Sequence, residues 1–306
     1  MDKKGNWFKI KKYSHIGQPL SYSQKHDVES YIRNKDKVAQ HAFFPLIRRV
    51  MKKYRYVSKG DTQHKVKRAK CRFISYATHL DSAIYSFYAQ QISNYYEQFL
   101  VQNNLADNII AYRTLSCKDR KGNKCNIDYA KEVFCFINEK LVFEDVAVIV
   151  FDIKGFFDNL DHKLLKYSWK KICQLDSMDA ASYAIYKNII KYSYVEENKL
   201  FDLFKDKIIC QTPTGIRSKK IKEKKYLRDK KAIAFCERVD IGIIREAYLI
   251  RKGNFDYENQ RYTHRGIPQG LPISAVLANI YMNYFDKNIS EDIATFGGLY
   301  RRYSDD

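Results

Sequence analysis

Carboxylates follow two segments that have the composition of β-strands. Asp152 comes directly after the apolar run at 142–151, and Asp305 and Asp306 come after the short stretch 299–303. A run that is β-branched and apolar on both faces is typical of a central strand. If the two strands are neighbours in one sheet, their ends bring hard oxygen ligands to one place, as a pair of divalent metal ions requires. Taken alone, an acid such as Asp152 is more often a surface cap, and a final acid pair is usually a solvated tail.

A loop and a helix lie between these two segments. Residues 265–274 contain two Gly and two Pro, which predict a sharp loop. From Ala275 onward, apolar residues recur at helical spacing, and Ser274 is the expected cap of that helix. The order along the chain is therefore a strand with an acid, a loop with a helix, and a strand with an acid pair. Each part is common alone, but the combination is specific.

The first half of the chain shows mainly helical patterns. Residues 23–56 are expected to be helical, with a basic polar face that is either solvated or follows a phosphate backbone. A long helix is predicted over 75–100 and another over 127–140. Residues 117–125 have the Gly, Asn and charges of an exposed turn. Asp161 is the expected cap of the helix that follows it.

The charge balance favours a polyanionic partner. The 306 residues include 55 Lys and Arg against 35 Asp and Glu, a formal net charge of +20, which suits nucleic acid. The run 217–231 is strongly basic and is expected to be exposed, either as a solvated loop or as a nucleic-acid contact. No apolar run approaches the roughly 20 residues of a spanning helix, and the start is no signal peptide. We therefore expect a cytoplasmic protein with no membrane partner, and its seven Cys, which include no Cys-x-x-Cys pair, to be reduced thiols.

In this combination the chain resembles reverse transcriptases. The resemblance rests on three motifs: Phe151-Asp152-Ile153-Lys154-Gly155-Phe156-Phe157-Asp158-Asn159-Leu160-Asp161-His162, Arg265-Gly266-Ile267-Pro268-Gln269-Gly270-Leu271-Pro272-Ile273-Ser274, and Tyr303-Ser304-Asp305-Asp306. It covers residues 142–306 specifically and 65–140 more loosely. The fold that it implies is an α+β right-hand polymerase with fingers and palm, in which an antiparallel palm sheet is flanked by helices.

The resemblance also implies a metal site and a sugar gate. Asp152, Asp305 and Asp306, with the carbonyl of Ile153, would be catalytic ligands of two Mg²⁺ ions, and Mn²⁺ could substitute. Phe157 corresponds to the bulky residue that excludes a ribose 2′ hydroxyl in this family, which favours DNA synthesis. The alternative is that Phe157 is a core aromatic, but Phe156 is the better core candidate because alternate residues of an extended strand point to opposite faces.

Nucleotide and nucleic-acid contacts follow from the same resemblance. Gln269 and Gly270 match the loop under the incoming nucleotide. Lys70 and Arg72 fit the basic pair of the fingers that holds the triphosphate, although Cys71 replaces the Pro common between such residues, and neighbouring cations compete for the role. The candidates for nucleic-acid contact are Arg113, Arg217, Lys219, Lys220, Lys224 and Lys225.

The expected domains are a helical N-terminal extension (1–64), fingers (65–140) and palm (141–306), with a basic insertion around 196–262. In the family a second hairpin strand and a helical thumb follow the acid pair, and both are absent from this sequence. We therefore expect it to be the front part of a longer polypeptide.

The segment His41-Ala42-Phe43-Phe44-Pro45-Leu46, the Tyr112-Arg113 pair and the first motif look like bacterial reverse transcriptases of antiphage defence and abortive infection. The expected activity is RNA-templated DNA synthesis from dNTPs, with a non-coding RNA as template and DNA as product. A homo-oligomer or an accessory protein is left open. The alternatives are a protein-primed or untemplated DNA polymerase and a catalytically silent nucleic-acid-binding protein. An RNA-synthesising polymerase is disfavoured by Phe157.

Overall fold

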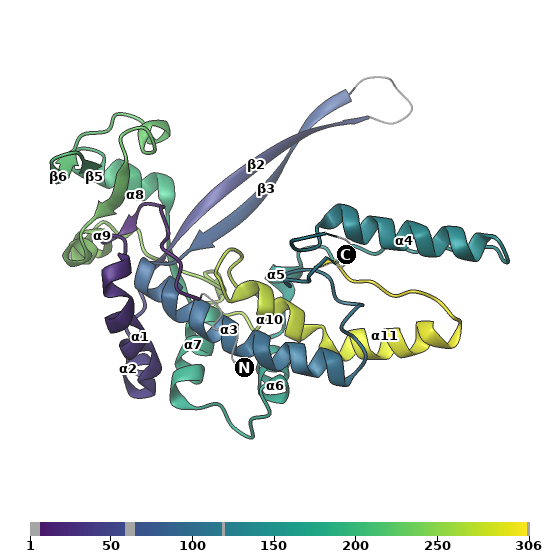
Figure 1. Ribbon diagram of the computed structural model, residues 1–306. Helices are drawn as coiled ribbons and strands as arrows, with labels where there is room; N and C mark the ends of the chain where they lie inside the picture. Colours follow the sequence, from purple (N-terminus) through teal and green to yellow (C-terminus); the bar gives the residue numbers. More distant parts are fainter. Residues whose placement is uncertain (1–6, 59–64, 118–119, 305–306) are drawn as a thin grey trace. The chain divides into compact units, whose positions relative to one another are not determined.

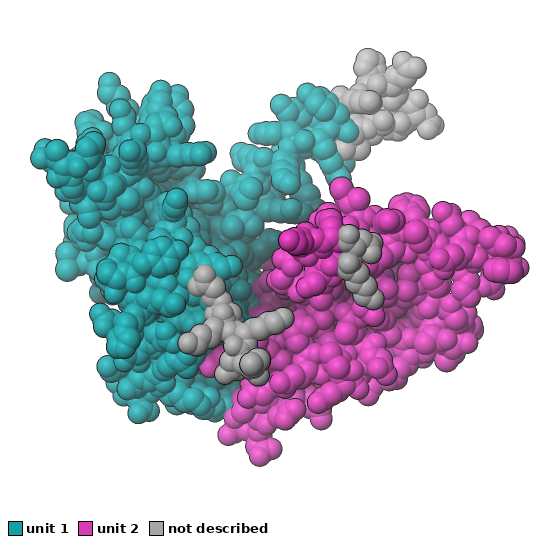
Figure 2. Space-filling view, in the orientation of Figure 1, with its two compact units in different colours: residues 1–90, 178–274 teal, residues 91–177, 275–306 magenta. Residues whose placement is uncertain are grey.

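The computed structural model describes residues 7–58, 65–117 and 120–304. Within these ranges the protein is a mixture of helices and strands, as predicted, and it divides into two compact units (Figure 2). Unit 1 comprises Met1–Gln90 and Met178–Ser274, and unit 2 comprises Gln91–Ser177 and Ala275–Asp306. No helix of the described ranges combines the length and the apolar character that crossing a membrane requires.

Helices and strands are interspersed along the chain (Figure 1), with five successive helices from α3 to α7. The α-helices are α1 (Lys25–Arg33), α2 (Lys35–Ala39), α3 (His79–Gln102), α4 (Asn126–Leu141), α5 (Phe156–Asn159), α6 (His162–Ile172), α7 (Ala180–Ile190), α8 (Glu197–Phe204), α9 (Ile241–Glu246), α10 (Ser274–Tyr281) and α11 (Asn283–Thr295). The strands are β1 (His15–Ile16), β2 (Leu46–Ser58), β3 (Lys65–Tyr76), β4 (Ser193–Glu196), β5 (Ile208–Thr212), β6 (Gly215–Lys219), β7 (Ala232–Cys236), β8 (Arg251–Lys252), β9 (Phe255–Asp256) and β10 (Arg261–Tyr262).

All of these strands belong to unit 1. One sheet has the order β1-β7-β5-β6, in which β1 and β7 are parallel and the other pairs antiparallel. A second has the order β3-β2-β4-β8, in which β2 and β4 are parallel and the other pairs antiparallel. Both sheets are therefore mixed, and β9 and β10 add a small antiparallel pair.

A core of apolar side chains joins the two larger sheets and α8. Its members come from strands of both sheets, from the buried face of α8, from α9 and from the segment after β6: Ile16, Ile47, Val195, Leu200, Phe201, Phe204, Ile208, Cys210, Ile221, Ala232, Phe235, Cys236 and Ile244. Ile221 is of interest because it lies inside the basic run 217–231. The buried side chain of Ile221 anchors this run to unit 1. Most of the neighbouring side chains are exposed, which confirms the prediction that the run is exposed.

The helix predicted over 46–56 is wrong, since these residues form strand β2. It pairs with β3 in a long antiparallel ribbon (Figure 1), with Lys53 opposite Lys70 and Met51 opposite Arg72. The basic residues Arg48, Arg49, Lys52 and Lys53 recur at a spacing that also suits a helix face. These residues form a strand because β3, some 20 residues later, pairs with them, and the local sequence pattern does not show that partner. The helical part of the predicted range consists of α1, α2 and a short 3-10 helix at Tyr22–Gln24.

Other predicted helices are confirmed. Helix α3 covers the predicted 75–100 from His79, and α4 covers 127–140. Asp161 caps α6 as expected, because its side chain accepts a hydrogen bond from the backbone nitrogen of Leu164. The predicted turn at 117–125 is closed by a bridge between Ser116 and Asn123.

The central strand predicted over 142–151 is absent. The residues have no strand structure, and Val150 and Phe151 are 80% and 74% exposed. The predicted strand at 299–303 is reduced to a single parallel bridge between Arg302 and Ile109. An apolar, β-branched run becomes a buried strand only where neighbours pair with it. In the described part of unit 2 no strand does so.

Candidate active site

The acid pair Asp305-Asp306 lies outside the described residues, but its immediate support is defined. Ser304 is buried and has a left-handed backbone with a φ of 68°. Its carbonyl oxygen accepts a hydrogen bond of 2.8 Å from Nη1 of Arg302, and its hydroxyl lies 2.7 Å from that of Tyr112. A non-glycine residue in this conformation is strained, and such strain persists where the surroundings hold it. The residue before the acid pair is thus fixed through both its backbone and its side chain.

Arg302 is the centre of a buried polar network in unit 2. Its Nε and Nη2 donate to the two carboxylate oxygens of Asp286 at 2.7 and 2.8 Å, and the side chains are 4% and 0% exposed. The hydroxyl of Tyr300 donates to Asp286 as well, and Nη1 of Arg302 contacts Asn279 at 3.2 Å. Burial raises the pKa of the Asp286 carboxyl, while the hydrogen bonds from Arg302 and Tyr300 oppose this rise. Such a fork between guanidinium and carboxylate fixes orientation as well as position.

The sequence analysis did not single out this network. A signal was present in the helical segment after the loop, where Asn279, Asn283 and Asp286 follow the spacing of a single helix face. All three are buried. Polar residues on a buried face need partners, and Arg302 provides them for Asn279 and Asp286.

Asp152 and Ile153, the other predicted metal ligands, lie in the extended segment before α5. Asp152 is exposed and Ile153 is 38% exposed. In the described part of the chain no three His, Cys, Asp or Glu side chains are grouped so that they could hold a metal ion. Two of the three predicted carboxylates fall on the residues that are not described. As a donor set, three carboxylates and a carbonyl have the hard oxygen atoms that Mg²⁺ prefers.

The two phenylalanines of the first motif have different environments. Phe156 is 5% exposed and its ring lies 6.3 Å from that of Tyr281, whereas Phe157 is half-buried. The prediction that Phe156 is the core residue is confirmed, but the reason given for it is wrong. Both residues belong to the short helix α5 rather than to a strand. Phe157 therefore keeps part of its ring accessible.

Gln269 and Gly270 lie against the end of β3 in unit 1. The backbone nitrogen of Ser75 donates to the carbonyl of Gln269 at 2.8 Å. Gly270 has a φ of +110°, and a Cβ there would lie 2.6 Å from the carbonyl oxygen of Ser75. The loop is therefore docked on the strand by a backbone contact that only glycine permits. Ser274, the predicted cap, is instead the first residue of α10, and its hydroxyl donates to the carbonyl of Pro268.

We expect Gly270→Ala to destabilise the protein more than Gly215→Ala. Both glycines have a positive φ, +110° and +115°, but a Cβ at Gly215 would meet nothing within 4 Å. Backbone strain of about 1–3 kcal/mol is common to both variants, while the clash at Ser75 adds about 1–3 kcal/mol. Urea unfolding of the two variants measures the difference. Equal free energies of unfolding would show that the loop is not held against β3.

Lys70 and Arg72 lie on the same ribbon face as Ile74. Alternate residues of a strand share a face, and Ile74 is the side chain closest to the Cβ position of Gly270. Arg72 is two residues away, a rise of roughly 7 Å along the strand. Lys70 and Arg72 are both exposed. The predicted loop therefore lies against the end of the strand, β3, that also carries the two predicted cations.

The six residues predicted to contact nucleic acid differ in how free their charged groups are to bind a phosphate. The Arg113 side chain is 4% exposed and binds Glu97 and the carbonyls of Ala106 and Ile109, so that it supports the fold of unit 2. Three lysines pair with acids: Lys220 with Asp206, Lys224 with Glu197 and Lys225 with Glu223. Arg217 and Lys219 lie on the exposed edge strand β6.

Residues 219–306 match the family model described as reverse transcriptase (RNA-dependent DNA polymerase). No match to a curated protein was found. The matched segment runs from β6 through the Gln269–Gly270 loop and α11 to the acid pair. This C-terminal part of the chain is therefore similar to reverse transcriptases, and nucleotidyl transfer is the activity that the similarity supports.

Proposed function

We propose that the protein is a reverse transcriptase that uses an RNA template to add dNTPs to a primer 3′ hydroxyl. The observation that carries the proposal is the family match, which ends at Asp306. The buried contacts of Ser304 support it, because a catalytic constellation requires groups held to within a fraction of an ångström. The net charge of +20 suits a nucleic-acid partner.

Asp152, Asp305 and Asp306, with the carbonyl of Ile153, are the residues that would hold Mg²⁺ in this proposal. Two such ions, when bound, supply activation of the attacking hydroxyl and stabilisation of the leaving pyrophosphate. The protein's own part is to hold the carboxylates in position. Arg302 contributes by donating a hydrogen bond to the carbonyl of Ser304, which fixes the backbone directly before Asp305.

Lys70 and Arg72 would bind the triphosphate, and Gln269 and Gly270 would lie beside the nucleotide. The contact of the loop with β3, the strand that carries both cations, supports these roles. Charge-assisted contacts from Lys and Arg are the usual means of binding phosphate. Arg217 and Lys219 are the exposed candidates for contact with the nucleic-acid backbone.

We expect Phe157→Ala to relax sugar selection. The half-buried ring of Phe157 is the proposed barrier to a 2′ hydroxyl, and its removal opens space without adding charge. The ratio of dNTP to NTP incorporation should fall by about tenfold or more, since the loss of a steric barrier of a few kcal/mol changes a rate by that amount. Phe73→Ala, which removes an exposed ring from unit 1, is the matched control. Unchanged selection in Phe157→Ala would assign the gate to another residue.

The biological setting that we propose is antiphage defence in the bacterial cytoplasm, with a non-coding RNA as template. It is supported by the sequences of residues 41–46, 112–113 and 156–162, which resemble those of bacterial reverse transcriptases of antiphage defence.

The test of the proposed function is template dependence. Purified protein is given Mg²⁺ and all four dNTPs with a primed RNA, with the primer alone, or with neither. We expect extension only with primed RNA, and a product whose sequence is complementary to it. Extension of the primer alone, or DNA attached covalently to the protein, would contradict templated synthesis and favour the untemplated, protein-primed alternative.

A further inference from the structure

A cationic pocket of about 520 Å³ lies in unit 1. Its walls come from the N-terminal segments on both sides of β1, from β2, from α8 and from the segment 227–235. None of the predicted catalytic or nucleotide-binding residues lines it. Its volume is within the roughly 300–1,000 Å³ of small-molecule sites.

The lining carries more positive charge than its carboxylate can neutralise. Five cationic side chains contribute to it, against Glu197 as its acid: Lys11, Lys12, Arg49, Arg228 and Lys231. Within the described part of the chain, Lys11, Lys12, Arg228 and Lys231 form no ion pair. Burial and the nearby charge of Lys9 lower the pKa of Lys11. Unpaired cations gathered in a concave site attract an anion.

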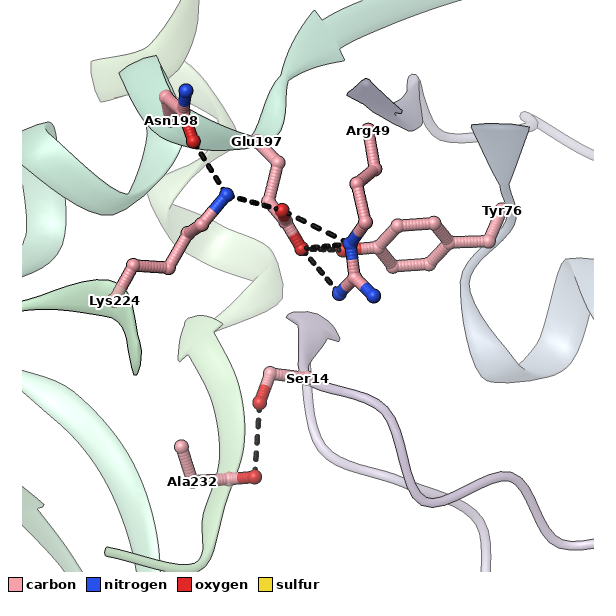
Figure 3. Close-up of polar contacts among 7 residues, drawn as sticks. All are labelled: Ser14, Arg49, Tyr76, Glu197, Asn198, Lys224 and Ala232. Atoms are coloured by element: carbon pink, nitrogen blue, oxygen red, sulfur yellow. Dashed lines mark hydrogen bonds and ion pairs between the residues drawn. The ribbon is translucent and has the colours of Figure 1, made fainter. Parts of the chain in front are cut away.

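Glu197 is already committed to its own partners (Figure 3). It is 2% exposed and accepts hydrogen bonds from Nε of Arg49 at 2.9 Å, from Nζ of Lys224 at 2.7 Å and from the hydroxyl of Tyr76 at 2.9 Å. Burial raises the pKa of Glu197, but Arg49 and Lys224 together outweigh this and hold it below its ordinary value. Glu197 is therefore a charged anchor that fixes Arg49 at the pocket.

Arg49 keeps part of its guanidinium available. It binds Glu197 through Nε and Nη2 (Figure 3), and its side chain is nevertheless 52% exposed. An arginine held in this way is pre-oriented, and less entropy is lost when it binds a phosphate.

Apart from Tyr13 and Ser14, the remaining lining is apolar. Ile10, Pro19, Leu20, Leu227, Ile233 and Phe235 contribute to it. At the basic side, Lys231 has a left-handed backbone with a φ of 51°, and the carbonyl of the next residue, Ala232, accepts a hydrogen bond from Ser14. The lining thus combines cations with apolar side chains, which suits a ligand that combines phosphate groups with an apolar ring.

We propose that this pocket binds a nucleotide through its phosphates, at a site separate from the proposed catalytic residues. Arg49 and the segment 228–231 contact the phosphate groups, and the apolar side chains contact the base. Because Arg49 belongs to β2, the ligand also touches the base of the ribbon that carries Lys70 and Arg72.

The test is equilibrium dialysis of the whole chain with radiolabelled ATP in EDTA, which removes the divalent ions that the proposed catalytic site requires. We expect saturable binding at one site per chain. Arg228→Glu and Lys231→Glu should each weaken it by about tenfold or more, because each replaces an attractive charge with a repulsive one. Lys222→Glu makes the same charge change at an exposed residue outside the pocket and should leave the affinity unchanged. Arg72→Glu changes the proposed triphosphate site instead and reports whether the labelled ATP binds there.

Several results would overturn the proposal. Absence of saturable binding up to millimolar ATP would do so, as would equal weakening by Lys222→Glu, which would indicate general attraction to a basic protein. Weakening by Arg72→Glu alone would place the ATP on the ribbon. Unlabelled tripolyphosphate and ATP are also compared as competitors. ATP should compete about tenfold better, and equal competition would exclude a contribution from the base. None of these outcomes depends on whether the protein synthesises DNA.

Discussion

Arg302→Met should destabilise the protein by about 3–5 kcal/mol, because it leaves the carboxylate of Asp286 buried without its cation. It also removes the hydrogen bond to the Ser304 carbonyl. We therefore expect DNA synthesis to fall further than the folded fraction does. Arg301→Met is the matched control, since the neighbouring arginine is only partly buried and its hydrogen bond is to the carbonyl of Tyr300. Urea unfolding and primer extension at a temperature where both variants are folded measure the two effects.

A double-mutant cycle separates the ion pair from simple loss of packing. Asp286→Leu alone leaves Arg302 buried without its carboxylate, and Arg302→Met alone leaves the acid. The double variant leaves neither charge, so that it should be less destabilised than the sum of the two single variants by about 1–3 kcal/mol. Additive losses would show that Arg302 and Asp286 do not interact in the folded protein.

Acid should destabilise unit 1 through His15. Its Nδ1 accepts a hydrogen bond of 2.7 Å from the backbone nitrogen of Ile16, so that Nε2 is the nitrogen that donates to the carbonyl of Tyr76 at 3.0 Å. Burial, which is complete, lowers the pKa of His15 from 6.5 to about 3. Between these values the unfolded chain binds a proton that the folded chain does not. The contribution of His15 is therefore complete above pH 6.5 and is lost as the pH falls towards 3.

At pH 4.5 this loss amounts to about 3 kcal/mol relative to pH 7.5. His15→Gln retains a donor for the Tyr76 carbonyl but does not titrate. The stability difference between wild type and this variant should therefore shrink by about 3 kcal/mol over that range. His26→Gln, at a side chain that is 95% exposed, is the control and should follow the wild type. A pH-independent difference between wild type and His15→Gln would show that folding does not lower the pKa of His15.

The sequence predicted the elements that depend on local signals. Helices α3 and α4 follow from apolar spacing over many turns, and the start of α6 from a single capping side chain, Asp161. The sharp loop at 265–274 was also predicted, although its docking on Ser75 was not. These features need only neighbours in the sequence.

Features that depend on distant partners were missed. The β2–β3 ribbon requires two basic segments to pair, and neither has the alternation that marks a half-buried strand. The apolar run at 142–151 has strand composition but has no pairing strand in the described part of unit 2. Arg and Asp are residue types that usually lie on the surface, so no local signal indicates that Arg302 and Asp286 are buried. Only the fold brings the two side chains together in a buried ion pair. The metal site at Asp152, Asp305 and Asp306 stays a prediction.

The most direct test of the central claim is primer extension on RNA by wild type, Asp305→Asn and Asp292→Asn, with Mg²⁺ and dNTPs. Asp292 is an exposed acid of α11 and is the control for the charge change. We predict that wild type and Asp292→Asn extend the primer equally, and that Asp305→Asn is slower by about 1,000-fold or more, as expected when a metal ligand worth several kcal/mol is lost. Extension by Asp305→Asn at the wild-type rate would contradict the assignment of the acid pair to catalysis.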